Sequence, residues 1–334
     1  MSSPENTPVP SPDRSRLAAA WISFGASLGL LALKSYSYEV TGSSAVLSDA
    51  LESIVNVLTA AVALFVIRFA AQPADREHPY GHGKAEYFSA SFEGGLIFFA
   101  AMVIFLESLR AFFHGVSLRE LDYGFLLMLI AALLNLLLGI YLKRTGRRQN
   151  SEALSASGAH VLSDVKTTVG VALGLLLVKI TGYTWLDPLA AMIVALFLAW
   201  EGYRIVRRSV GGLMDERDFG LLETLAAAMW KHRRPGVIEI HQLRILRSGN
   251  FHHVDGHMVV PEYWDVSQAH ELTERFERAV AAEYPHDIEF AFHTDPCRQR
   301  YCQVCDMPDC PIRLAAFKFL QPFTVPRLIG EANF

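Results

Sequence analysis

No cysteine precedes Cys297 in this chain of 334 residues, and all four of its cysteines fall between Cys297 and Cys310. So tight a cluster, absent from the rest of the chain, indicates a local metal or redox feature. Charged residues are scarce too, at 19% of the chain, and their formal net charge of −4 gives no reason to expect nucleic acid as a partner. Residues 1–16 lack the basic segment of a cleaved signal peptide. They are polar and rich in proline, which predicts a disordered N-terminal tail.

Apolar residues, in contrast, are abundant and occur in long runs. They make up 51% of the chain, and the mean hydropathy of +0.25 is too apolar for a soluble protein of this length. Each of six runs is close to the length of about 20 residues that a helix needs to cross a bilayer. The sequence therefore predicts an α-helical membrane protein with six transmembrane helices within residues 17–208. The predicted spans are Leu17–Leu33, Ala45–Ala71, Tyr87–Phe113, Tyr123–Leu142, Val161–Ile180 and Leu186–Val206. The alternative is a soluble helical protein with a very apolar core.

Lysine and arginine are distributed unevenly between the loops, which predicts the orientation of the spans. Basic residues follow the second, fourth and sixth spans, whereas the loops near residues 36–44, 114–122 and 181–187 are poor in positive charge. Because basic loops stay in the cytoplasm and the number of spans is even, we expect both termini to be cytoplasmic.

The composition becomes that of a soluble domain after Val210. Helical periodicity and strand-like alternation follow one another in the order α-β-β-α-β, over Phe219–His232, Val237–Leu246, His252–Val260, Val266–Tyr284 and Ile288–His293. This order predicts a cytoplasmic α/β domain of ferredoxin-like type over residues 209–296. Residues 297–334 contain the cysteines and show no clear pattern after Cys310, so we expect a Cys-rich C-terminal tail.

Polar residues on two of the predicted spans form the first candidate metal site. His160 and Asp164, four residues apart on the fifth span, stack on one face of a helix. An ionisable residue inside a membrane costs about 2.5–3.5 kcal/mol and usually marks an ion path. Asp49, Glu52 and Asn56 share one face of the second span. These oxygen and nitrogen donors predict a site for zinc, iron(II) or manganese(II). The alternative is hydrogen bonding between buried polar residues of neighbouring helices.

The loop between the second and third spans holds a second candidate site. Asp75, His78 and His82 lie close together in Gln72–Glu86, among turn-forming prolines and glycines. Two histidines and a carboxylate are a plausible ligand set for a metal, and a solvated polar loop is the alternative.

The soluble domain holds a third candidate site. Its ligand candidates fall on separate predicted elements, and two of them are spaced to lie on one face of a strand. They are His241, His257, His270, His293 and Asp295. Five such residues in so small a domain favour a metal cluster over unrelated surface histidines.

Four features together resemble the cation diffusion facilitator family, most closely its bacterial zinc and iron exporter branch. They are the loop Gln72–Glu86, the H-x-x-x-D pair at His160, the motif H-Q-L-R-x-x-x-S-G at His241 and the motif H-T-D-P-C at His293. The resemblance covers about Leu17 to Cys297. It implies a homodimer in the bacterial inner membrane that exports a divalent metal ion in exchange for protons, with a cytoplasmic metal-sensing domain. Zn²⁺ is the leading substrate, with Fe²⁺, Cd²⁺ and Mn²⁺ as alternatives, and the protein is a transporter rather than an enzyme.

The resemblance also implies roles for the candidate residues. Glu52, Asn56, His160 and Asp164 occupy the four places of the family's transport site. Asp75, His78 and His82 match its loop site, and His241, His257, His270, His293 and Asp295 match the site at its dimer interface. Lys84 and Asp215 match an intersubunit charge pair.

The chain departs from the family pattern at the transport site. Glu52 stands where the family usually has histidine or aspartate, and Asn56 where it usually has aspartate. A neutral amide is a poor zinc ligand, so Asn56 predicts weak, water-mediated or absent coordination, and Asp49 is the candidate replacement. A membrane-anchored metal sensor without ion flux is therefore the rival function. A membrane metalloenzyme is disfavoured, because no nucleophile or base is positioned beside the candidate ligands.

The cysteines are a second departure from the family pattern. Cys297, Cys302, Cys305 and Cys310 are spaced C-x4-C-x2-C-x4-C. Four thiolates in a reducing cytoplasm fit a structural zinc knuckle. The first three spacings also match a plant-type iron–sulfur pattern. Zinc is the preferred interpretation, ahead of an iron–sulfur cluster and of a set of unligated thiols.

Overall fold

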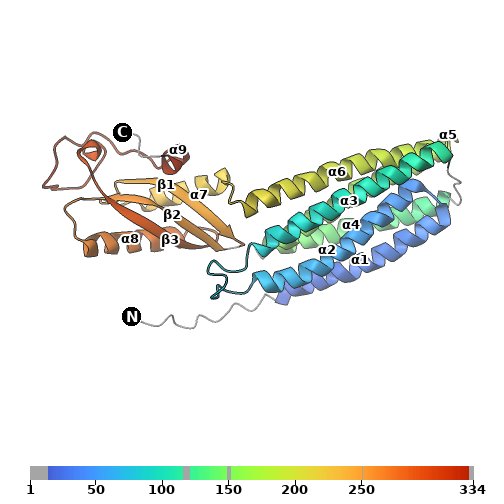
Figure 1. Cartoon of the computed structure of the whole chain (residues 1–334), viewed down its shortest axis with the longest axis horizontal. Coiled ribbons are helices and arrows are strands. Elements are labelled where there is room, and N and C mark those ends of the chain that lie inside the picture. The colour runs from blue at the N-terminus through green and yellow to red at the C-terminus, as the bar shows by residue number, and fades with distance from the viewer. Residues whose placement is uncertain (1–13, 116–120, 149–151, 250, 331–334) are drawn as a thin grey trace. The chain divides into compact units, whose positions relative to one another are not determined.

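The computed structural model describes residues 14–115, 121–148, 152–249 and 251–330, and Figure 1 shows the whole chain. The chain divides into two compact units, Met1–Met214 and Asp215–Phe334. Most of the predicted N-terminal tail lies outside the described residues, and the first helix begins at Arg14.

Six long helices make up the first unit and run alongside one another in Figure 1. They are α1 (Arg14–Thr41), α2 (Ser44–Ala70), α3 (Ala85–His114), α4 (Leu121–Arg148), α5 (Glu152–Thr181) and α6 (Leu186–Leu213). Each is long and apolar enough to cross a membrane, which confirms the six predicted spans. Apart from α2, each helix is longer than its apolar run, because polar residues continue the backbone hydrogen bonding beyond the hydrocarbon core.

A buried carboxylate fixes the start of α2. Ser43 caps this helix, since its side chain accepts from Val46 N. Ser43 Oγ also donates to Asp187 Oδ1 at 2.5 Å, and Ser44 N donates to Asp187 Oδ2 at 2.7 Å. Asp187, at the start of α6, is fully buried. The two helices are therefore held together at their N-terminal ends by an acid that accepts from a serine hydroxyl and a backbone amide.

Glycines let the helices approach closely. Gly94 of α3 and Gly202 of α6 face each other, and a Cβ on Gly202 would lie 2.7 Å from Gly94 O. A Cβ on Gly158 of α5 would lie 2.4 Å from Lys143 N of α4. Such contacts between small residues are typical of helices that pack inside a membrane. Large apolar side chains on the outer surface, such as Phe99 and Leu133, are 66% and 56% exposed and suited to contact with lipid.

The second unit contains a three-stranded sheet and two main helices. Its elements are α7 (Phe219–His232), β1 (Glu239–Ser248), β2 (Phe251–Val260), α8 (Val266–Ala281) and β3 (Asp287–Pro296). Strands β1 and β2 form an antiparallel pair, and β3 lies parallel to β2, connected to it through α8. Apolar side chains of α7 and α8 form one core with the strands. The predicted α-β-β-α-β order is confirmed.

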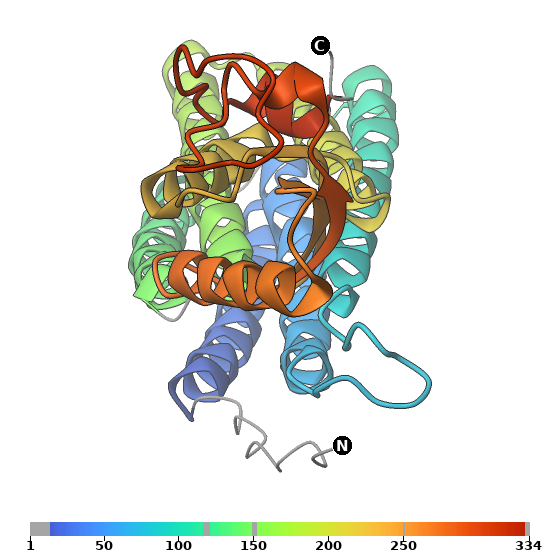
Figure 2. The same cartoon turned by 90° about the vertical axis from the view of Figure 1, so that its left-hand side faces the viewer.

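The segment after β3 packs onto this domain although its sequence shows no periodicity. It contains the 3-10 helix η1 (Gln299–Tyr301) and the short helix α9 (Val325–Ile329), and Figure 2 shows it in red as an irregular loop leading into α9. Phe323 and Leu328 are buried in the domain core, and Gly330 O accepts from Gln242 N of β1 at 3.1 Å. The core of the domain therefore includes residues from near the C-terminus.

Candidate metal sites

Helices α2 and α5 bring the predicted transmembrane donors into contact. His160 Nε2 lies 2.9 Å from Asn56 Oδ1, and Asn56 Nδ2 donates to Asp164 Oδ2 at 2.5 Å. His160 Nδ1 lies 3.7 Å from Asp164 Oδ1. All three side chains are buried. The amide of Asn56 thus bridges the imidazole and the carboxylate that the sequence singles out.

Several potential metal-ligating atoms at this point are buried without a hydrogen bond among the described residues. Glu52 Oε2 accepts from Thr167 Oγ1 at 3.1 Å, but Glu52 Oε1 has no hydrogen bond. The same is true of His160 Nδ1 and Asp164 Oδ1. Buried polar atoms normally form hydrogen bonds, so potential metal ligands on two helices that form none need an explanation. Two carboxylates and an imidazole with free lone pairs suit a divalent cation.

A buried lysine that the sequence reasoning missed lies next to this group. Lys34 Nζ of α1 is 2.9 Å from Asp49 Oδ1, which also accepts from Thr168 Oγ1 at 2.8 Å. Asp49 Oδ2 has no hydrogen bond among the described residues. Lys34 was missed because the apolar run of the first span ends at Leu33, so the lysine resembles a loop residue at the edge of the span. Its charge also acts on Glu52 and Asp164.

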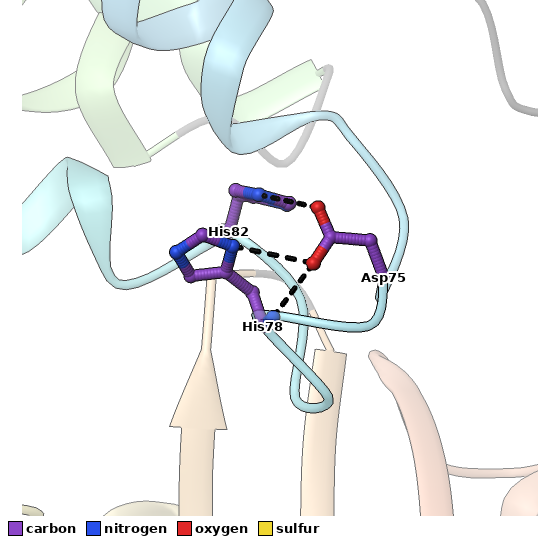
Figure 3. Close-up of side chains that lie close together, drawn as sticks. All are labelled: Asp75, His78 and His82. Carbon is purple, nitrogen blue, oxygen red and sulfur yellow. Dashed lines mark hydrogen bonds and ion pairs between the residues drawn. The ribbon is translucent and has the colours of Figure 1, made fainter.

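Figure 3 shows the loop site, where the carboxylate of Asp75 faces two imidazole rings. Asp75 Oδ1 is 3.3 Å from His78 Nδ1, and Asp75 Oδ2 is 3.4 Å from His82 Nε2. Donor atoms of these residues all lie within 4.8 Å of one another. Backbone N–H groups of His78 and Glu77 donate to Asp75 and lower its pKa, which keeps it ionised. The rings of His82 and Phe69 are 4.7 Å apart, which helps to hold His82 in a buried position.

The strand register creates the cluster in the second unit. His241 of β1 pairs with His257 of β2, which pairs with His293 of β3, so three histidines stand side by side across the sheet. Their neighbouring rings are 5.2 and 4.9 Å apart. Asp295 contacts all three, with Oδ2 2.9 Å from His257 Nδ1 and 3.7 Å from His241 Nε2, and Oδ1 3.5 Å from His293 Nε2. Burial lowers the pKa of His241, which favours the neutral ring that binds metals.

His270, in contrast, is not brought to this cluster within the part of the chain that the structure describes. The tightest group of donor atoms consists of His241, His257 and Asp295. His270 is exposed on α8, where its charge acts on Glu277. A role for His270 as a ligand remains a prediction.

The four cysteines are free thiols that line a single pocket of about 460 Å³. They lie in the loop that leads away from β3. Burial raises the pKa of Cys297 and of Cys305.

These features define a class of protein: a multi-pass membrane protein with groups of potential metal-ligating side chains in both of its units. Comparison with known proteins supports this class and gives the family. The family described as cation efflux transmembrane domain matches residues 20–214, and the one described as cation efflux protein, cytoplasmic domain, matches residues 223–297. The chain belongs to the cation diffusion facilitator family, whose members are cation efflux transporters.

Individual relatives cover most of the chain. An uncharacterized transporter from Synechocystis is 38% identical over 263 residues, which are 78% of this chain and 84% of the relative. Proteins named cation-efflux pump FieF from Serratia proteamaculans and Yersinia pestis are each 29% identical over 274 residues, covering 80% of this chain and 88% of each relative.

Proposed function

We propose that this protein exports a divalent transition-metal ion, Zn²⁺ foremost, from the cytoplasm in exchange for protons. It does so across the bacterial inner membrane as a homodimer, with both termini in the cytoplasm. The observation that carries the proposal is the set of unpaired donor atoms on Glu52, His160 and Asp164, buried between two membrane-spanning helices. The names of the cation-efflux pumps that it resembles and the cytoplasmic family domain support it.

The donor set also suggests how protons are exchanged. A metal binds only deprotonated ligands, so binding releases protons and protonation ejects the ion. His160 is the leading proton carrier, since an imidazole changes its charge near physiological pH. Asn56 Oδ1 contacts His160 Nε2 and Asn56 Nδ2 donates to Asp164 Oδ2, so His160 Nδ1 and Asp164 Oδ1 are the atoms left for the ion.

The proposal assigns a separate role in metal export to each part of the chain. Residues 17–208 carry the ion, residues 209–296 bind metal and dimerise, and residues 297–334 form the Cys-rich segment. Asp75, His78 and His82 bind metal at the loop, and the histidine cluster on the sheet bears the regulatory metal. Metal in the cytoplasmic domain then favours one membrane conformation over the other.

Flux measurement separates this function from its rival, a membrane-anchored metal sensor, which the amide of Asn56 favours. Purified protein in proteoliposomes with an imposed pH gradient should transport Zn²⁺, and the flux should stop when the gradient is collapsed. Metal binding without flux would support the sensor instead.

A further inference from the structure

The four cysteines surround a pocket that belongs to neither histidine cluster. Cys297 follows directly after β3, and the other three lie on the loop beyond η1. All four line the same pocket, together with Tyr263 and Arg313. Four cysteines that line one cavity are a candidate ligand set for a four-thiolate metal site.

The floor of this pocket is part of a packed core. Tyr301, Val304 and Cys305 are 2%, 5% and 6% exposed. They form a cluster with Ile238, directly before β1, and with Val259 of β2, and Cys297 packs against it. The cysteine-bearing loop is thus anchored at a fixed place on the domain.

Two arginine side chains stabilise the conformation of the cysteine-bearing loop. The guanidinium of Arg313 donates to three backbone carbonyls, at 3.0 Å to Cys302, 3.1 Å to Cys305 and 2.7 Å to Met307. Arg233 makes a bidentate ion pair with Asp306, at 2.6 and 2.8 Å. These contacts fix the backbone on both sides of Cys305.

A backbone amide points at one of the sulfur atoms. Glu262 N donates to Cys297 Sγ at 3.4 Å, which helps to orient this sulfur. All four cysteines are free thiols and none is engaged in a disulfide.

We propose that Cys297, Cys302, Cys305 and Cys310 bind one structural Zn²⁺ ion, which is distinct from the transported ion and from metal on the histidine cluster. A four-thiolate zinc site is closed to further ligands and contributes directly to folding. Residues 297–330 contain only one turn of 3-10 helix and one five-residue helix, so they have little regular structure of their own. The ion would tie this segment to the end of the sheet.

The thiols themselves provide the test, because every cysteine of the chain belongs to this site. In full-length protein in detergent, stripped with a chelator under reducing conditions, the partly exposed thiols of Cys297, Cys302 and Cys310 should react rapidly with an alkylating reagent, and the buried thiol of Cys305 more slowly. After Zn²⁺ is restored, the rate should fall by an order of magnitude. A rate unaffected by Zn²⁺ would overturn the proposal. No substitution is needed, so misfolding of a variant cannot confuse the result.

Substitutions of cysteines and histidines then identify the residues that bind the ion. Cobalt-loaded protein should show thiolate-to-cobalt charge-transfer absorption, and the double variant C302S/C305S should lose it together with one equivalent of zinc per chain. The matched control, H241A/H257A, removes ligands of the neighbouring cluster and should keep both the absorption and the thiol protection. Loss of thiol protection in the control would place the zinc on the histidines. Iron and inorganic sulfide in the purified protein would show that the cysteines hold an iron–sulfur cluster.

Discussion

Lys34 Nζ lies 2.9 Å from Asp49 Oδ1, and both side chains are fully buried between α1 and α2. The pair is neutral overall, so it adds no net charge to the neighbouring donors Glu52 and Asp164. With these two carboxylates ionised and His160 neutral, the proposed transport site has a charge of −2, which matches one divalent cation. Since Lys34 and Thr168 both use Asp49 Oδ1, only Oδ2 is left for a metal.

The first prediction concerns this pair. Lys34→Met leaves Asp49 as an unpaired buried charge, and we expect a loss of stability of about 3–5 kcal/mol. Thermal unfolding in detergent measures it. The double variant Lys34→Met with Asp49→Asn removes both charges and should recover most of the lost stability. Equal melting temperatures for the single variant and the wild type would show that the ion pair is not structurally important.

The second prediction concerns the helical pair on α5. His160→Ala and Asp164→Ala should each reduce Zn²⁺ flux in proteoliposomes to background, while the protein remains a folded dimer. The reason is that each substitution removes a buried donor with a free lone pair. His114→Ala, an exposed histidine at the end of α3, is the matched control and should transport normally. Wild-type flux from either α5 variant would refute the assignment of the site.

The third prediction concerns Asn56. Asn56→Asp replaces a neutral amide, within hydrogen-bonding distance of His160 and Asp164, by a carboxylate. The added negative charge should tighten zinc binding, because an amide is a poor zinc ligand. In the metal-free state the new carboxylate lies beside Asp164, so it should take up an extra proton and steepen the pH dependence of transport. Calorimetry and pH-dependent flux measure the two effects, and if neither changes, Asp49 becomes the leading candidate for the fourth ligand.

The fourth prediction concerns the cytoplasmic unit. A fragment from Asp215 to Phe334 should fold alone, because it forms a compact unit with its own core. Zn²⁺ should raise its melting temperature, as any ligand of the native state does. In His241→Ala this shift should shrink, since the strand register places that ring against His257 and Asp295. The absence of any shift at saturating zinc in the unmodified fragment would count against a sensing role.

The fifth prediction is a pH dependence of the same fragment, measured with a chelator present. His252 is buried, with Nδ1 2.9 Å from Tyr284 Oη. Burial, with a further contribution from His286, lowers the pKa of His252 to about 4. In the unfolded chain the pKa is about 6.5, so between these values the unfolded chain binds a proton that the native domain does not. The stabilising contribution of neutral His252 is therefore complete above about pH 6.5 and is lost as the pH falls towards 4.

A substitution isolates this effect. His252→Gln removes the titrating group and keeps a hydrogen-bonding group near Tyr284, so its melting temperature should decline less steeply on acidification. His253→Gln, at the neighbouring position on β2, should keep the wild-type slope. Identical slopes for all three proteins would assign the pH dependence to other groups.

Much of the fold could be predicted from the sequence, because the signals are local. The length of each apolar run is sufficient to predict a spanning helix. The spacing of His160 and Asp164 places them on one helix face, and alternating patterns predict the strands of the second unit. The ends of the helices were less predictable: α1 continues through Lys34 to Thr41, beyond the apolar run that ends at Leu33.

By itself, then, the sequence determined the six membrane spans, the α-β-β-α-β order of the second unit and the helix face that His160 shares with Asp164. Tertiary structure decided which of those elements meet. The contact of Lys34 with Asp49, the alignment of His241, His257 and His293, and the packing of Leu328 into the core all join residues that are distant in the chain or paired by strand register. Periodicity describes one element at a time. The partner of a buried charge, by contrast, depends on how elements pack, and that is a property of the whole chain.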